Sequence, residues 1–114
     1  MGVEDFTEFK KHFKYYQNLF GLNGYHVYFV YSRLNKSYAN ISVDQNSMVA
    51  TVRLNSKLLK REELDKDIKR SAKHEALHLL LAKYSHIAGA RYVTSEEPDE
   101  AEEELVNKLS NIIQ

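Results

Sequence analysis

The stretch of this sequence most informative about its structure is residues 72–82, AKHEALHLLLA. With Leu64 and Ile68 upstream, its apolar residues recur at helical spacing, which predicts a long helix from about Arg61 to Tyr84. The second half of this helix is apolar nearly all round, a pattern typical of a helix buried between layers. Residues 74–78 of the same helix form an HExxH motif.

The spacing within the motif indicates metal chemistry. Residues four apart lie one turn apart on one helix face, so His74 and His78 can bind the same ion. Glu75 points about a quarter turn away, where its carboxylate can polarise a metal-bound water. Burial of these groups would be costly without a partner or a cation. The alternative is a core histidine that bonds locally while Glu75 faces water.

Upstream of the motif, the pattern predicts one helix and three strands. Aromatic residues at helical spacing predict a helix from about Asp5 to Phe20, with Gly21 as its stop and the aromatic stripe in the core. Alternating patterns predict strands over residues 25–31, 39–44 and 48–54, with a tight turn at residues 45–47. Because the connections are short, we expect a three-stranded antiparallel meander.

Downstream of the motif, a short strand is expected at Arg91 to Thr94, followed by a final helix that opens at Glu97-Pro98-Asp99. The apolar side of that helix is expected to comprise Leu105, Val106, Leu109, Ile112 and Ile113. The order helix, three strands, helix, helix predicts an α+β fold. The length of 114 residues suits a single domain over residues 1–114.

Composition narrows the classes of function. The chain has 16 basic and 16 acidic residues, which argues against a general nucleic-acid binder. It has no cysteine, so a metal must be held by His, Asp or Glu. We find no targeting signal and no apolar run long enough for a membrane, so we expect a cytoplasmic protein.

A catalytic zinc needs a third protein ligand, and three residues compete for that role. Residues 96–104 hold seven acids, most of them expected to be a solvated helix start. Glu102 and Glu103 both border the buried stripe of the final helix, and geometry alone does not separate them. His86 is the other candidate, but on a continuous helix it would lie too far from His78 to share the ion.

An HExxH helix followed by a glutamate on the next helix resembles the gluzincin zinc metallopeptidases. In the related ImmA/IrrE-like group the second motif is roughly Glu-x-x-Ala-Asn-x-Phe, and residues 103–109 here are EELVNKL. The resemblance implies a zincin-like fold with zinc bound by His74, His78 and Glu103, and with Asn107 holding an imidazole. Val106 and Ser110 depart from the small residues of the ImmA pattern. The compact chain also resembles metallopeptidase-like proteins of phages and prophages.

This resemblance implies a zinc metalloendopeptidase that hydrolyses a protein or peptide substrate, with Glu75 as general base. Tyr84, His86, Arg91 and Tyr92 are candidates to stabilise the oxyanion. The substrate is expected to add as a strand beside residues 48–54 or 38–44.

Two other functions compete with this reading. The first is a catalytically inactive zincin-fold phage protein that acts as a protein-binding module, since fold does not establish function. The second is a SprT-like protease that acts on DNA-bound proteins. Its only support is a basic stretch over residues 57–73, which acidic residues interrupt.

Overall fold

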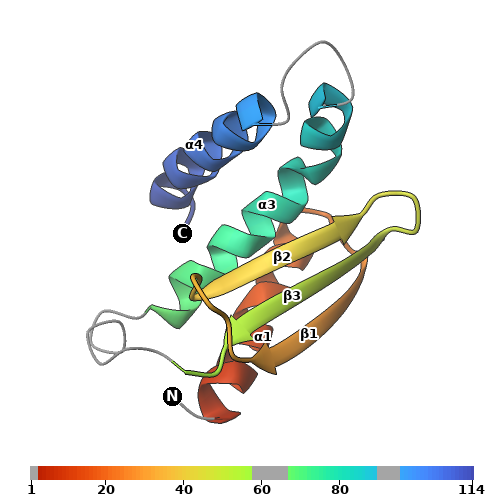
Figure 1. The fold of residues 1–114 in the computed structure, drawn as a ribbon. Helices are drawn as coiled ribbons and strands as arrows, with labels where there is room; N and C mark the ends of the chain where they lie inside the picture. The colour runs from red at the N-terminus through yellow and green to blue at the C-terminus, as the bar shows by residue number, and fades with distance from the viewer. Residues whose placement is uncertain (1–2, 58–66, 90–95) are drawn as a thin grey trace.

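A computed structural model describes residues 3–57, 67–89 and 96–114 (Figure 1). Its elements follow in the order α1 (Val3–Leu19), β1 (His26–Ser32), β2 (Ala39–Asp44), β3 (Val49–Asn55), α3 (Ile68–Gly89) and α4 (Glu96–Ile112). The predicted α+β class is confirmed. The predicted strand at 91–94 lies outside the described residues, as do residues 61–66 of the predicted long helix.

The sheet is mixed, so the predicted antiparallel meander is wrong. β3 lies in the centre, parallel to β1 and antiparallel to β2, and the strand order is β1-β3-β2. Ala50 of β3 pairs with Val27 on one side and with Val43 on the other. Alternation in a sequence identifies strands but not their neighbours. The segment 33–38 can reach roughly 20 Å, enough to pass over one strand position at about 4.8 Å per strand.

The turn between β2 and β3 is where the sequence placed it. The side chain of Asp44 accepts hydrogen bonds from the backbone N–H groups of Asn46 and Ser47, at 3.1 and 3.3 Å. Met48 then adopts a left-handed φ of 55° before β3 begins. The turn therefore joins β2 and β3 directly as a hairpin.

The core lies between the sheet and the helices α1 and α3, which lie behind it in Figure 1. The aromatic stripe of α1 enters this core as predicted, and Phe13 meets Phe29 of β1 edge to face, with ring centroids 5.5 Å apart. Gly21 ends the helix with a φ of 73°, where its N–H bonds to the Asn18 carbonyl. This is the left-handed cap that glycine favours.

Helix α3 begins at a cap and is longer at its far end than predicted. The Asp67 carboxylate accepts a hydrogen bond from the Arg70 backbone N–H at 2.9 Å, which satisfies one of the free donors of the first turn. The helix then continues through Ser85 to Gly89, past the expected end at Tyr84.

Helix α4 packs on α3 with part of the face expected, since Val106 is buried and Leu109 and Ile113 are partly buried. Val106 and Ser110 are buried, whereas Leu105 and Ile112 are 41% and 74% exposed. The prediction of Leu105 and Ile112 on the apolar side is therefore wrong. The buried residues lie four apart, and one turn before Val106 the same spacing brings Glu102 toward α3.

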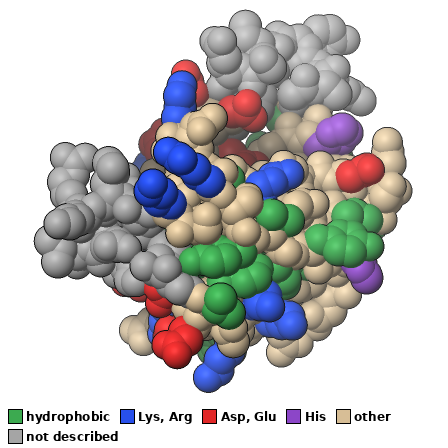
Figure 2. All heavy atoms as spheres, turned by 60° about the horizontal axis from the view of Figure 1, so that its bottom comes forward, with side chains coloured by type: hydrophobic (Ala, Val, Ile, Leu, Met, Phe, Trp, Pro, Cys, Tyr) green, Lys and Arg blue, Asp and Glu red, His purple; other side chains and the backbone are tan. Residues whose placement is uncertain are grey.

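In the parts of the chain that the structure describes, the helices cover one face of the sheet. Tyr28 and Val30 of β1 are 54% and 37% exposed on the opposite face. Figure 2 shows a face on which hydrophobic side chains gather near the centre, with basic and acidic side chains scattered around them. Within the described ranges, none of the helices combines the length and apolar character needed to span a membrane.

Candidate metal centre

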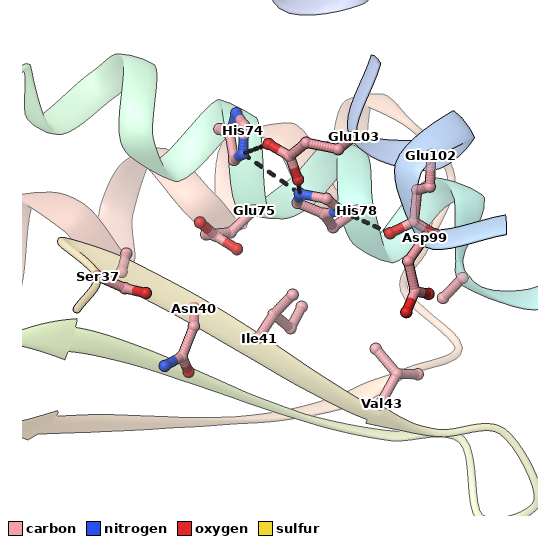
Figure 3. Close-up of a pocket in the computed structure, with 12 residues that line it drawn as sticks. Ser37, Asn40, Ile41, Val43, His74, Glu75, His78, Asp99, Glu102 and Glu103 are labelled. Atoms are coloured by element: carbon pink, nitrogen blue, oxygen red, sulfur yellow. Dashed lines mark hydrogen bonds and ion pairs between the residues drawn. The ribbon is translucent and has the colours of Figure 1, made fainter. Parts of the chain in front are cut away.

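Three side chains from two helices converge at the interface of α3 and α4. His74 and His78 lie one turn apart on α3, and their Nε2 atoms are 3.2 Å apart. Glu103 of α4 reaches both rings. Its Oε1 lies 3.1 Å from His74 Nε2, and its Oε2 lies 2.9 Å from His78 Nε2 (Figure 3).

These separations suit a small tetrahedral ion. Nitrogen and oxygen ligands about 2.0–2.1 Å from a tetrahedral zinc lie about 3.3 Å from one another. The two Nε2 atoms are 3.2 Å apart, close to that edge length, while Glu103 approaches His74 with one oxygen at 3.1 Å and His78 with the other at 2.9 Å. One ligand atom from each of His74, His78 and Glu103 lies within 4.8 Å of the other two. The group therefore has the geometry to hold a metal ion.

A second carboxylate fixes the ring of His78 from its other side. Glu102 Oε2 lies 2.6 Å from His78 Nδ1, while Glu102 Oε1 accepts a hydrogen bond from the Ser85 hydroxyl. An ionised carboxylate can only accept, so the proton of this pair lies on Nδ1. Nε2 of His78 is then the nitrogen left for a ligand, an arrangement common in metal sites.

The protonation of the pair follows from these contacts. Burial acts to raise the pKa of Glu102, but the hydrogen bonds from His78 and Ser85 outweigh it and lower that pKa. Burial acts to lower the pKa of His78, but the bond to Glu102 and the charges of Glu75 and Glu103 raise it. When the only ring proton of His78 lies on Nδ1, the lone pair of Nε2 faces a lone pair of Glu103 Oε2 at 2.9 Å. Either a second proton on His78 or a bound cation relieves this repulsion.

The environment of His74 favours its neutral form. Burial and the charge of His78 lower the pKa of His74, against the opposing effect of Glu103. A neutral imidazole is the form that binds a metal ion.

Glu75 is a buried carboxyl group beside this cluster. It is 6% exposed, and burial raises its pKa to about 7. In Figure 3 its side chain points from α3 toward β2, on the opposite side of the imidazoles from Glu103. A carboxyl group with a pKa near 7 is well matched to accept and return a proton at neutral pH.

The cluster opens into a cavity of about 490 Å³. One wall is β2, with Ala39, Ile41 and Val43, and the opposite walls are α3 and α4. Within the described residues β2 is an edge strand, paired with β3 alone. A cavity bounded by an edge strand and a group of potential metal ligands can hold an extended peptide.

The structure separates the candidates for a third ligand. Glu103 faces the Nε2 atoms of both histidines, whereas Glu102 lies on the Nδ1 side of His78. His86 is exposed in the last turn of α3 and is not part of the group. Asn107 is exposed too, and no hydrogen bond among the described residues joins it to an imidazole. The residue that bonds to the His78 ring is Glu102 instead of Asn107.

Of the four candidates for oxyanion stabilisation, the two that the structure describes do not line the cavity. Tyr84 is 75% exposed and His86 is exposed on the same helix. Arg91 and Tyr92 lie outside the described residues. The substrate edge at residues 48–54 is excluded, because β3 is paired on both sides. The expected edge at residues 38–44 contains β2, the wall of the cavity.

Sequence reasoning missed two residues of this site. Ser85 contacts Glu102, and Arg70 lines a smaller cavity next to His74 and Glu75. Arg70 lies one turn before His74, and Ser85 lies two turns after His78. Helical spacing from the motif could therefore have identified both residues.

No family model matches this chain, and comparison with curated proteins and with solved structures gave no match either.

Proposed function

We propose that this chain is a zinc-dependent peptidase of the zincin type. The observation that carries the proposal is the convergence of His74, His78 and Glu103 next to the buried carboxyl group of Glu75. Two imidazoles and one carboxylate form a ligand set that leaves a fourth position open, as catalytic zinc sites do. The resemblance of the motif to gluzincins points to the same activity.

Each residue of the site has a distinct part in this function. A bound zinc supplies Lewis acidity toward a carbonyl group and a water of lowered pKa. His74, His78 and Glu103 hold the ion, and Glu102 orients the ring of His78 through Nδ1. Because these groups come from two packed helices, their relative positions are fixed by the fold.

Glu75 moves the proton. Its carboxylate accepts a proton from the attacking water and then donates that proton to the departing amine, so the carboxylate is regenerated. A pKa of about 7 favours both transfers near neutral pH, because neither protonation state of Glu75 is strongly preferred.

The substrate binds as an extended strand along β2. The edge of this strand that has no partner among the described residues offers backbone donors and acceptors, and residues of β2 line the same cavity as His74 and Glu75. Pairing with β2 presents the peptide main chain to the site and leaves specificity to the side-chain pockets.

Metal content and peptide cleavage test this function together. Elemental mass spectrometry of protein purified without chelators or nickel columns should find one zinc per chain. The Glu103→Gln variant should lose the zinc, while Glu104→Gln, a neighbour paired with Lys108 on the exposed side of α4, should retain it. A wild-type chain that binds no zinc even when zinc is supplied would sink the proposal.

Cleavage of a degenerate peptide library then separates a peptidase from a binding module. Glu75→Gln should retain zinc but hydrolyse peptides about 10²- to 10⁴-fold more slowly than wild type. If wild type and Glu75→Gln both bind zinc and neither cleaves any peptide, the chain is a non-catalytic binding protein.

A further inference from the structure

A second, smaller cavity of about 230 Å³ adjoins the metal centre. The two cavities share Ala39, His74 and Glu75, so they form neighbouring compartments along β2. Along this edge of the sheet the smaller cavity is lined by Tyr38 and Ala39, whereas the larger one extends from Ser37 to Val43. A peptide paired with β2 would pass both.

The two compartments differ in charge. Besides the shared Glu75, the larger cavity is lined by three further acids, Asp99, Glu102 and Glu103. The smaller cavity is lined by one cation, Arg70, together with the hydroxyl residues Tyr38 and Ser71. The positive charge of Arg70 also acts on His74, where it contributes to the lowered pKa of the imidazole.

The guanidinium of Arg70 has unused hydrogen-bonding capacity. One of its nitrogens donates to the side-chain oxygen of Asn111 at 3.0 Å. In the parts of the chain that the structure describes, no acidic side chain forms an ion pair with Arg70. A guanidinium carries five N–H donors in a planar fork that matches a carboxylate. The charge of Arg70 is therefore available to a ligand.

We propose that the cavity lined by Arg70, Tyr38 and Ser71 is a subsite for a carboxylate of the bound peptide. This inference rests on the proposed function, because it places the carboxylate within a few residues of the bond to be cleaved. The carboxylate is either an Asp or Glu side chain or the C-terminal group of the peptide. Both present the same two oxygens to Arg70.

Peptide binding tests the subsite without requiring cleavage. The probes are fluorescein-labelled, amidated octapeptides based on alanine and leucine, each with one Glu at a different position, and matched peptides with Gln. A further pair has a free or an amidated C-terminus and no Glu. Fluorescence anisotropy is measured with zinc-loaded Glu75→Gln protein, which leaves the peptides intact.

We expect one position, or the free C-terminus, to give about fivefold tighter binding than its uncharged counterpart, a difference that shrinks with added salt. Adding Arg70→Gln should remove this preference. Adding Lys69→Gln, an equal charge change at an exposed neighbour that does not line the cavity, should retain it. Circular dichroism checks that both variants are folded.

Equal binding of Glu and Gln peptides at every position and of both C-termini would overturn the subsite, as would equal losses in the Arg70 and Lys69 variants. Failure of every peptide to bind would overturn it too. The peptidase proposal fails separately. If binding depends on Arg70 but wild type cleaves no peptide, the activity is refuted and the subsite is retained. If wild type cleaves peptides but neither binding nor cleavage depends on Arg70, the subsite is refuted and the activity is retained.

Discussion

Helix α3 presents an apolar face to the hydrophobic core and a polar face to α4 and the cavity beside β2. On the first face Ala72, Ala76 and Leu79 are almost completely buried among other apolar side chains. On the second face His74 and His78 meet carboxylates of α4. Hydrophobic burial is non-directional, whereas the polar contacts require particular atoms at particular distances. The first face therefore holds the fold together, and the second contains the group of side chains that could hold a metal ion.

Substitutions on the two faces should have opposite consequences. Leu79→Ala should lower the free energy of unfolding by about 3 to 4 kcal/mol, because Leu79 is 1% exposed and its loss leaves a cavity. At native conditions it should still bind one zinc. Urea unfolding in the presence of a chelator and zinc content by mass spectrometry measure the two effects.

Glu103→Gln is the converse test. Glu103 is exposed, so in chelator we expect a stability within about 0.5 kcal/mol of wild type, together with loss of zinc. If Glu103→Gln destabilised the zinc-free protein as much as Leu79→Ala, the distinction between the two faces would be lost.

The polar face should make the stability of the zinc-free protein depend on pH through Glu75. Burial raises its folded pKa from 4.5 to about 7, so between these values the folded state holds a proton that the unfolded state has released. The resulting stabilisation is present below about pH 4.5 and is lost as the pH rises to about 7. The free energy of unfolding should fall by up to about 3 kcal/mol over this window.

Urea unfolding in chelator at several pH values measures this loss. Glu75→Gln does not titrate at this position and is the control. A pH profile identical in wild type and Glu75→Gln would contradict the burial of an ionisable group on this face.

Within the polar face, Glu102 should matter less than the ligands. Glu102→Gln removes the charge that favours Nδ1–H on His78, and we expect zinc affinity to fall about 10- to 100-fold. Competition with a chromophoric chelator measures the affinity. Glu100→Gln is an exposed control on the same helix. Unchanged affinity in Glu102→Gln would mean that helix packing alone orients the ring.

The smallest expected effect comes from the N-terminal cap of α3, which supports both faces of the helix equally. Asp67→Ala removes the cap of α3 and should lower the free energy of unfolding by about 1 kcal/mol. Zinc affinity at native conditions should not change, because the cap lies nearly two turns before His74. A marked fall in affinity would show that the start of the helix helps to position the metal ligands.

Sequence periodicity predicted the two faces of α3 but not all of their partners. The spacing of His74 and His78 follows from the helix itself, so their convergence could be predicted from the sequence. The choice between Glu102 and Glu103 depends on how α4 is rotated about its axis. That rotation was predicted only in part, since Val106 is buried as expected but Leu105 and Ile112 are exposed. The place of Arg70 in the smaller cavity could not be foreseen without the position of β2.

The sheet was harder to predict than the helices for a related reason. Helical contacts are local, whereas strand pairing joins residues far apart in the chain. The β2–β3 hairpin, set by the turn after Asp44, was predicted correctly. The parallel pairing of β1 with β3 had no local signal, because alternation is the same for either direction and for any neighbour.

The central position of β3 also bears on the order in which the chain folds. The β2–β3 hairpin closes a short loop and can form within microseconds, whereas β1 must find β3 across the intervening strand. We therefore expect the hairpin to precede the docking of β1, α1 and the C-terminal helices. On this route β2, which borders the larger cavity, is in place before α4 brings Glu102 and Glu103 to α3, and the last step of folding assembles the candidate metal centre.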